Sequence, residues 1–312
     1  MSLRVLHDWR DLPPEARGAA VALGNFDGVH QGHRQVVAEA AKAARALKAP
    51  LGVIRFTPHP ASVLRPDLDP YRLMTPEQQA RALEGLGVDL LYDLPFVEIA
   101  ELSDEAFARG VLAAGLGARH VAAGFDIRFG KDRLGDAESL KRWGDKYGFG
   151  VSIAPAVAAE GGAKVSSSAA REAVRAGEVD KAARILGRPF AIEGVVVEGQ
   201  HLGRKLGYPT ANVFLGDYVR PRLGSYATRT RLADGRIVPG VANIGQNPTT
   251  GLVDARLEVW LFDFDEDLYG QTIETELVAF IRPEAKFACL DELIAQIGDD
   301  AAKARAILTP EL

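Results

Sequence analysis

The sequence predicts an α/β protein with two parts, a parallel β-sheet covered by helices and then an antiparallel β-barrel that ends in a helix. Two observations lead to this prediction. Short apolar runs alternate with helical patterns in the first part of the chain, whereas strand-like runs follow one another directly in the second part. Because the pattern changes after residues 187–189, we expect one domain at residues 1–184 and another at residues 185–312.

The first part supplies strands and helices in turn. An apolar stripe at helical spacing runs from Val37 to Leu47, and Ser103 and Asp136 stand where further helices are expected to begin. Strands that alternate with helices pair in parallel, and ligands bind beyond their carboxyl ends. The expected strands are residues 21–23, 51–56, 89–94, 120–124 and 150–155.

The second part is predicted to be mostly antiparallel. The dipeptide Asp234-Gly235 is a strong signal for a hairpin between two of its strands. A helical pattern at residues 290–308 closes the chain. The expected strands are residues 191–199, 225–232, 237–245, 256–265 and 272–284.

Composition limits the function classes. The chain has 312 residues, of which 47% are apolar and 25% are charged, as in a soluble globular protein. Its net charge of −5 argues against binding a nucleic acid over a broad surface. The single cysteine, Cys289, excludes an internal disulfide and a multi-cysteine metal site. Because the first residues lack the apolar core of a signal peptide and no apolar run could span a bilayer, we expect a cytoplasmic protein with no membrane partner. The oligomeric state is left open.

The stretch VALGNFDGVHQGHRQVVAEA, residues 21–40, places glycines and histidines where a strand is expected to end and a helix to begin. Three glycines, Gly24 and Gly32 among them, allow the backbone to turn tightly and to approach a ligand closely. The free N–H groups at the start of the helix suit a phosphate. His30 and His33 lie one turn apart, so both can donate hydrogen bonds to one phosphate and stabilise the charge that develops during its transfer.

Two other interpretations of this stretch stay open. One is a capped helix with two surface histidines. The other is a metal site formed by His30, His33 and Asp27, although the sequence offers neither a cysteine cluster nor a third histidine nearby. Residue chemistry alone does not separate these interpretations from a phosphate site.

A second glycine-rich stretch, HLGRKLGYPTANV at residues 201–213, combines turn residues with phosphate-binding chemistry. Its glycines permit a loop that follows a phosphate closely, and the pair Arg204-Lys205 adds positive charge. Thr210 and Asn212 offer oxygens that suit Mg²⁺, which bridges nucleotide phosphates. Taken alone, the stretch is more typical of an ordinary β-turn.

Glu258 is a candidate general base. In the expected strand, Glu258, Trp260 and Phe262 face one side, while the apolar residues between them face the other. A carboxylate beside aromatic groups tends to have a raised pKa, which strengthens it as a base. The alternative is a glutamate exposed at the edge of a sheet.

Several segments of the chain resemble the motifs of one enzyme family. GNFDGVHQGH resembles the H-x-G-H motif of the nucleotidyltransferase superfamily, and later segments match the flavin adenylyltransferase branch in order and spacing. Another segment resembles the G-R-x-L-G-x-P-T-A-N motif of riboflavin kinases. The chain thus resembles the bifunctional bacterial riboflavin kinase/FMN adenylyltransferases over almost its whole length. The matched segments are residues 24–33, 57–66, 124–136, 165–172, 203–212, 240–251 and 257–270.

This resemblance implies a Rossmann-like nucleotidyltransferase domain and a riboflavin kinase barrel, which use ATP and Mg²⁺ to convert riboflavin to FMN and FMN to FAD. It implies that His30, His33 and Arg171 stabilise adenylyl transfer and that Glu258 is the kinase base. The implied nucleotide contacts are Gly24, Phe26, Asp27, His30, Gly32, His33, Ser166, Ser167, Ser168, Arg171, Gly203, Arg204, Gly207, Pro209, Thr210 and Asn212. The implied flavin contacts are His59, Asp126, Arg128, Phe129 and Glu258, and the implied metal ligands are Thr210 and Asn212.

Some of these assignments have structural alternatives. His59 could be a histidine held between two prolines, Asp126 could cap a loop, and the serine run at residues 166–168 is typical of a helix cap. The chain also departs from the family pattern, with Trp260 where histidine is common and Asn247 where a basic residue is common. Flavin affinity is the property that these departures put in doubt.

Three rival hypotheses remain at this point. One half of the enzyme could be inactive. The chain could be a relative of the aminoacyl-tRNA synthetases, which the acidic balance and the lack of a basic, aromatic-rich surface disfavour. It could also be a flavin-binding protein that does not turn over.

Overall fold

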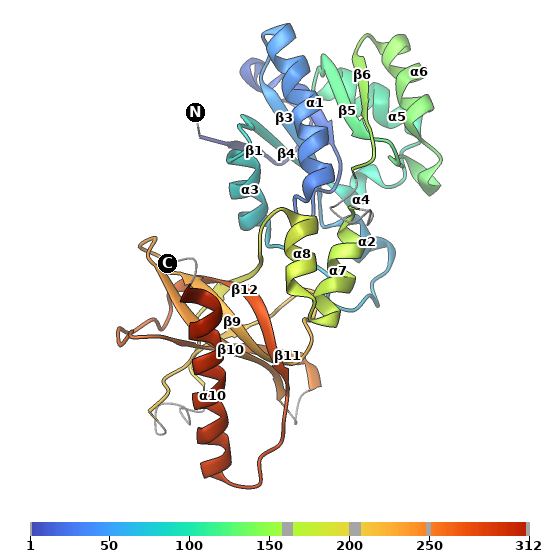
Figure 1. Cartoon of the computed structure of the whole chain (residues 1–312). Helices are drawn as coiled ribbons and strands as arrows, with labels where there is room; N and C mark the ends of the chain where they lie inside the picture. Colours follow the sequence, from blue (N-terminus) through green and yellow to red (C-terminus); the bar gives the residue numbers. More distant parts are fainter. Residues whose placement is uncertain (1, 158–164, 200–206, 248–250, 310–312) are drawn as a thin grey trace. The chain divides into compact units, whose positions relative to one another are not determined.

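The computed structural model describes residues 2–157, 165–199, 207–247 and 251–309. The chain divides into two compact units (Figure 1). The first comprises residues 1–68 and 76–166, and the second comprises residues 69–75 and 167–312. This division by contacts places residues 167–184 with the second unit, whereas the sequence analysis assigned them to the first.

In the first unit, the described residues form a six-stranded parallel sheet in the order β1-β4-β3-β2-β5-β6. The predicted α/β class is therefore confirmed. From β2 the chain adds β3 and β4 on one side, then crosses to add β5 and β6 on the other, so the strand order reverses between β2 and β5. The strands are β1 (Arg4–Leu6), β2 (Ala20–Leu23), β3 (Leu51–Thr57), β4 (Leu90–Pro95), β5 (His120–Gly124) and β6 (Gly150–Ala154).

Helices flank this sheet. Helix α1 packs against β2 and β5 (Figure 1), while Phe107, Leu112 and Leu140 from other helices join a core with β2 and β4. Both predicted caps are confirmed, since Ser103 accepts a hydrogen bond from Ala106 and Asp136 forms a reciprocal capping box. The helices are η1 (Pro14–Ala16), α1 (Gln31–Leu47), α2 (Pro60–Leu64), α3 (Pro76–Glu84), α4 (Phe96–Ile99), α5 (Asp104–Ala106), the π-helix η2 (Phe107–Gly115), η3 (Lys131–Arg133) and α6 (Ala137–Tyr147).

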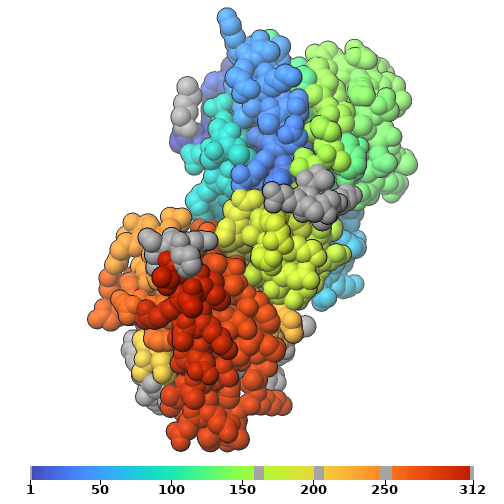
Figure 2. Space-filling view, viewed as in Figure 1, coloured from blue at the N-terminus to red at the C-terminus, as the bar shows by residue number. Residues whose placement is uncertain are grey.

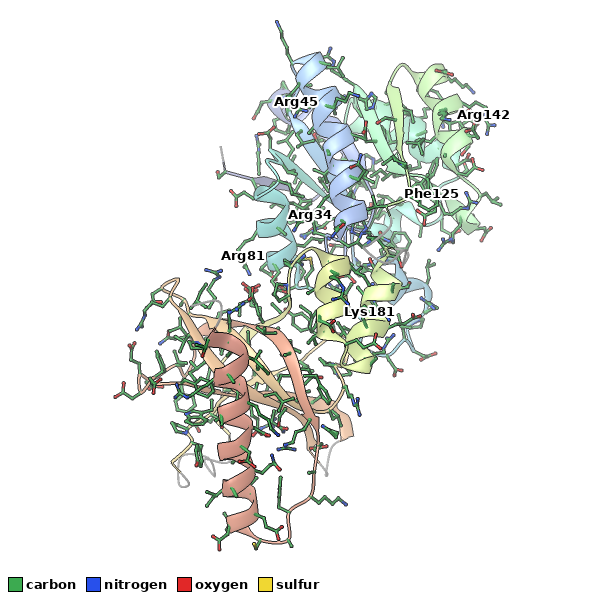
Figure 3. The ribbon with its side chains drawn as sticks, in the orientation of Figure 1. Arg34, Arg45, Arg81, Phe125, Arg142 and Lys181 are labelled. Atoms are coloured by element: carbon green, nitrogen blue, oxygen red, sulfur yellow. The ribbon has the colours of Figure 1, made fainter. Side chains whose placement is uncertain are left out.

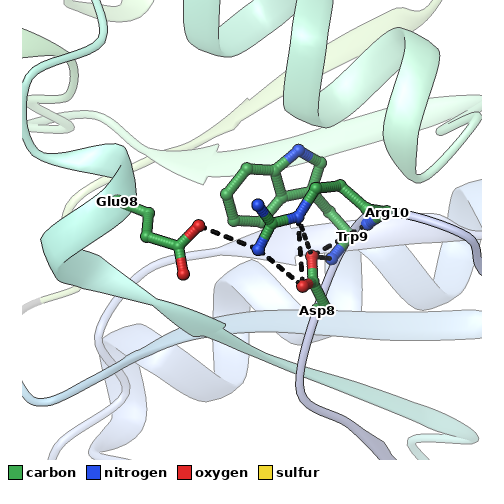
Figure 4. A network of polar contacts seen from close by, with 4 residues as sticks. All are labelled: Asp8, Trp9, Arg10 and Glu98. Carbon is green, nitrogen blue, oxygen red and sulfur yellow. Dashed lines mark hydrogen bonds and ion pairs between the residues drawn. The ribbon is translucent and has the colours of Figure 1, made fainter.

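A charged network joins the segment after β1 to α4 (Figure 4). Arg10 Nη2 lies 2.7 Å from Asp8 Oδ2 and 2.8 Å from Glu98 Oε2, and the guanidinium stacks 4.6 Å from the centroid of the Trp9 ring. The hydrogen bonds from Arg10 lower the pKa of Asp8 to about 2. Because exposed ion pairs stabilise proteins little, we infer that the network orients this segment more than it stabilises the fold.

The second unit is a nearly closed antiparallel barrel. Its described strands follow the order β7-β12-β9-β10-β11-β8, and an isolated bridge between Val197 and Asn212 joins β8 back to the segment after β7. The predicted hairpin is confirmed, because β9 and β10 are antiparallel and Gly235 adopts a left-handed φ of 89° between them. The strands are β7 (Phe190–Val195), β8 (Ala211–Phe214), β9 (Gly224–Arg231), β10 (Ile237–Asn247), β11 (Gly251–Leu261) and β12 (Thr272–Pro283).

Three helices accompany this barrel in the described part of the unit, namely α7 (Ser167–Ala176), α8 (Val179–Leu186) and α10 (Leu290–Leu308). Helix α8 packs against β7 and β12. The terminal helix α10, at the red end of the colour bar, lies on the visible face of its unit (Figure 2), and its Ala304 and Leu308 pack against Phe262 and Val241. Among the described residues, no helix is both long and apolar enough to cross a membrane.

Candidate active sites

The loop after β2 holds its backbone in left-handed conformations. Phe26, Gly28 and Val29 have φ values of 53°, 85° and 38°, and the Phe26 and Val29 side chains are completely buried. A left-handed φ is unfavourable for phenylalanine and more so for a β-branched valine, so tertiary packing must hold both. Such strain gathers where a chain must present its backbone in one geometry, here at the carboxyl end of a central strand.

The two histidines of this loop lie together. His30 is the N-cap of α1, and its Nδ1 accepts a hydrogen bond from the His33 backbone N–H at 3.2 Å. The two rings are stacked with centroids 3.6 Å apart and an angle of 14° between their planes. An Nδ1 that accepts a hydrogen bond carries no proton, so the neutral His30 ring carries its proton on Nε2.

Glycine at position 32 permits this arrangement. A Cβ atom there would lie 3.1 Å from His30 Cε1 and 3.8 Å from Val165 Cγ1. A side chain at this position would therefore push against the stacked ring. The same contact brings Val165, and with it Ser166, close to the start of α1 within the first unit.

The residues after β5 divide between surface and core. Asp126 and Arg128 are exposed, and Phe125 beside them is 48% exposed (Figure 3). Phe129 is buried against Phe107, with ring centroids 5.9 Å apart, so its geometry is that of a core residue. Of the three predicted flavin contacts in this loop, Asp126 and Arg128 therefore present polar groups at the surface, and Phe129 does not.

His59 takes a capping position. Its Nδ1 accepts a hydrogen bond from the Ala61 backbone N–H at 3.1 Å, at the start of the short helix α2. The Thr57–Pro58 peptide bond before it is cis. This geometry agrees with the structural alternative for His59.

The other predicted adenylyl-transfer residues belong to the second unit. Helix α7 begins at Ser167, and Ser168 is exposed in its first turn. Arg171 Nε donates to the Tyr71 carbonyl at 2.7 Å, and its guanidinium lies 5.4 Å from the centroid of the Tyr71 ring. Arg171 is thus oriented by Tyr71 within that unit.

In the barrel, three polar side chains lie opposite one another on neighbouring strands. Asn212 of β8 is paired with Glu258 of β11, and Glu258 is paired with Asn243 of β10. Directly opposed residues of an antiparallel sheet face the same side, so both amides flank the carboxylate. Asn243 was missed by the sequence analysis, because only the register of β10 and β11 reveals its neighbour.

Asn212 is held in a close-fitting position. Its side chain is 6% exposed, and its Nδ2 lies 3.4 Å from the Thr210 carbonyl oxygen. A Cβ atom on Gly199 would lie only 2.6 Å from that Nδ2, so glycine lets the amide approach the backbone. Gly207 has a left-handed φ of 87°, and Pro209 is exposed. Gly203 and Arg204 lie outside the described residues.

Glu258 has the predicted orientation. Leu257 and Val259 are completely buried on one face of β11, and Trp260 on the other face packs edge-on against Tyr208 with centroids 4.8 Å apart. The Glu258 side chain is open to solvent on one side, yet surrounding atoms exclude enough water that burial raises the pKa of its carboxyl. Arg256 opposes this rise.

The structure combines a strained loop at the switch point of a parallel sheet with a polar row on a barrel, formed by Asn212, Glu258 and Asn243. Together they define a two-unit enzyme of phosphate transfer. The family model described as FAD synthetase matches residues 12–169, and the one described as riboflavin kinase matches residues 186–308. The chain belongs to the family of bifunctional riboflavin kinase/FMN adenylyltransferases. It phosphorylates riboflavin to FMN and adenylylates FMN to FAD.

Relatives cover nearly the whole chain. A bifunctional riboflavin kinase/FMN adenylyltransferase of Pseudomonas fluorescens is 42% identical over 310 residues, which are 99% of this chain and 98% of that protein. The enzyme of the same name from Escherichia coli K12 is 39% identical over 97% of this chain and 96% of its own. A crystal structure from Streptococcus pneumoniae, which carries the name macrolide-efflux protein, has a TM-score of 0.85 at 33% identity and covers 100% of both chains.

Proposed function

We propose that the kinase reaction takes place at the polar row of the barrel. The observation that carries this proposal is the register that sets Asn212 directly opposite Glu258. Glu258 accepts the proton of the terminal ribityl hydroxyl of riboflavin as that oxygen attacks the γ-phosphorus of ATP. The bond to the β-phosphate oxygen breaks, and FMN and ADP leave. Positioning of the two substrates supplies most of the acceleration.

The donors around Asn212 fit Mg²⁺. Thr210 offers a hydroxyl and a carbonyl, Asn212 an amide oxygen, and Glu258 a carboxylate on the adjacent strand. Mg²⁺ takes oxygen ligands, keeps several waters and binds through few protein groups together with nucleotide phosphates. When bound, the ion would neutralise charge on the phosphates, and Thr210 and Asn212 would hold it.

We propose that adenylyl transfer takes place at the loop between β2 and α1. A phosphate oxygen of FMN attacks the α-phosphorus of ATP, and pyrophosphate leaves. The Nε2–H of His30, together with His33 and the first N–H groups of α1, stabilises the charge that develops on the transferred phosphoryl group. No covalent enzyme intermediate is needed.

The remaining assignments are supported by the resemblance and by chemistry. We propose that Ser166, Ser167 and Ser168 contribute hydroxyls and Arg171 a cation to the triphosphate, and that His59, Asp126 and Arg128 border the substrates. The buried Phe129 would act through the core that supports this loop. We also propose a cytoplasmic location and small-molecule partners, with neither nucleic acid nor membrane as a partner.

One assay tests both steps. Purified protein is incubated with ATP and Mg²⁺ and either riboflavin or FMN, and the flavins are separated by chromatography. We expect FMN and FAD from riboflavin, and FAD from FMN. In the variant His30→Ala/His33→Ala, FMN should accumulate because loss of one such donor typically costs roughly 10²–10³ in rate. Normal FAD formation by that variant would assign the histidines to helix capping.

A further inference from the structure

A buried ion pair lies at the carboxyl ends of β3 and β4. Arg55 Nη2 is 2.8 Å from Asp93 Oδ2, and the two side chains are only 8% and 7% exposed. Thr57 donates a hydrogen bond to the other oxygen of Asp93, and His7 Nδ1 lies 3.7 Å from Oδ2. The carboxylate is therefore held on both oxygens, and it fixes the guanidinium in turn.

Arg55 also forms hydrogen bonds to residues of α3. Its Nη1 donates to the Pro76 carbonyl and to Gln79 Oε1, each at 3.0 Å. Gln79 is 7% exposed, so its amide has little freedom to rotate. With Oε1 bound to Arg55, the Nε2 of the same amide points the other way.

Gln79 Nε2 donates to the Asn25 carbonyl at 2.8 Å. This carbonyl belongs to the peptide that joins Asn25 to Phe26, and Phe26 is the buried residue with a left-handed φ of 53°. Because a peptide is planar, a hydrogen bond to its oxygen fixes the direction of the following N–H as well. The Phe26 ring in turn lies 5.1 Å from the His33 ring.

We infer that Asp93, Arg55 and Gln79 are positioning residues for adenylyl transfer, which act by fixing the Asn25–Phe26 peptide and, through Phe26, the stacked histidines. Stability alone is a weak reason for this network, since a well-packed apolar pair can replace a buried ion pair at little cost. The network ends at the Asn25 carbonyl of the strained loop after β2. The core of the sheet, in contrast, is packed by apolar side chains. The inference rests on the proposed role of that loop.

The test separates positioning from folding. Gln79→Met keeps the volume of the side chain but removes both hydrogen bonds. Tyr92→Phe is the matched control, because it removes a buried hydrogen bond of 2.7 Å to the Ala16 carbonyl from the same sheet. We expect both variants to melt at a lower temperature. Only Gln79→Met should lower the kcat of FAD formation, by roughly 10- to 100-fold, since a small misplacement of reacting groups has effects of that size.

Further kinetic measurements and a second variant at position 79 add to this test. The kinase kcat and KM of Gln79→Met should stay within about twofold of the parent, because that reaction uses the barrel. The KM for FMN should also change little, because no flavin contact is removed. Gln79→Glu, assayed at pH 8, keeps an acceptor for Arg55 but offers the Asn25 carbonyl no donor, so it should fold and lose FAD formation as Gln79→Met does.

The outcomes distinguish this inference from the proposed function. If Gln79→Met and Tyr92→Phe lose FAD formation equally, or if Gln79→Glu forms FAD normally, the network is structural and the inference is wrong. If His30→Ala/His33→Ala forms FAD normally, the role of the loop itself fails. Loss in the histidine variant without loss in the Gln79 variants leaves the proposed function intact and overturns only the inference.

Discussion

Glu258 combines a side chain that is open to solvent with a carboxyl whose pKa is raised by burial. These two properties suit a general base, which must be reached by a substrate and must hold a proton more readily than a fully hydrated carboxylate. The amides of Asn212 and Asn243 stand on either side of it across the sheet. At the scale of single residues, the kinase proposal can therefore be tested at one position.

Glu258→Gln should separate the two activities. The amide fits the same space but cannot accept the hydroxyl proton, so FMN formation should fall by roughly 10²–10⁴, the usual contribution of general-base catalysis. FAD formation from supplied FMN should stay near the parent rate, because none of the residues proposed for adenylyl transfer lies on β11. Chromatography of both reactions measures this. A near-normal kinase rate would show that Glu258 is not the base.

A second prediction concerns the pH dependence of the kinase rate and of the stability, compared between the parent enzyme and Glu258→Gln. The base must be ionised, so the parent kinase rate should rise with pH through an apparent pKa above the ordinary value of glutamate. A pKa that is raised in the folded state stabilises the fold below the unfolded pKa, and this contribution is lost as pH rises through the folded pKa. Glu258→Gln should therefore melt higher than the parent at neutral pH and lose that advantage in acid. Thermal melts at a series of pH values measure this, and an equal difference at all pH values would contradict it.

Among the helices and strands, those with a long and regular apolar pattern could be predicted from the sequence. The strands at residues 51–57 and 120–124, the loop before α1 and the terminal helix all match segments that the alternation of apolar residues predicts. Strands β1 and β8 were not predicted, because β1 has only three residues and β8 lies in the glycine- and proline-rich stretch that is typical of a turn. Gln79 and Asn243 were missed for a different reason, since their neighbours are set by packing and register between segments far apart in the chain.

The start of α1 offers a prediction at this scale. Gly32→Ala places a methyl group 3.1 Å from the His30 ring, which is already stacked on His33 and has little room to move. Alanine stabilises a helix by about 1 kcal/mol relative to glycine, so the melting temperature should not fall much. FAD formation should fall while riboflavin phosphorylation is unchanged. A variant with unchanged FAD formation would show that the ring stack tolerates displacement. Gly110→Ala is the control, because its Cβ would meet nothing within 4 Å.

For the whole molecule, the division into two units indicates which fragments of the chain should fold on their own. We expect residues 185–312 to fold alone and to phosphorylate riboflavin, because they contain all strands of the barrel. The contacts also group residues 167–184 with the barrel, where α8 packs on β7 and β12. A fragment of residues 167–312 should therefore melt higher than one of residues 185–312, and both should form FMN. Circular dichroism and the kinase assay measure this. If neither fragment is active while the full chain is, the barrel depends on the first unit.

The closure of the barrel has a consequence for how this enzyme fails on heating. Strand β8 is four residues long, and beyond its ladder with β11 the described residues join it to the segment after β7 by one isolated bridge, Val197–Asn212. A strand with so little pairing on one side opens at a lower free energy than the strands inside a sheet. Because Asn212, the proposed Mg²⁺ ligand, forms that bridge, opening of β8 should displace this residue. Riboflavin phosphorylation should therefore be lost on heating before the core of the barrel melts, which kinase assays and circular dichroism over the same temperature range would measure.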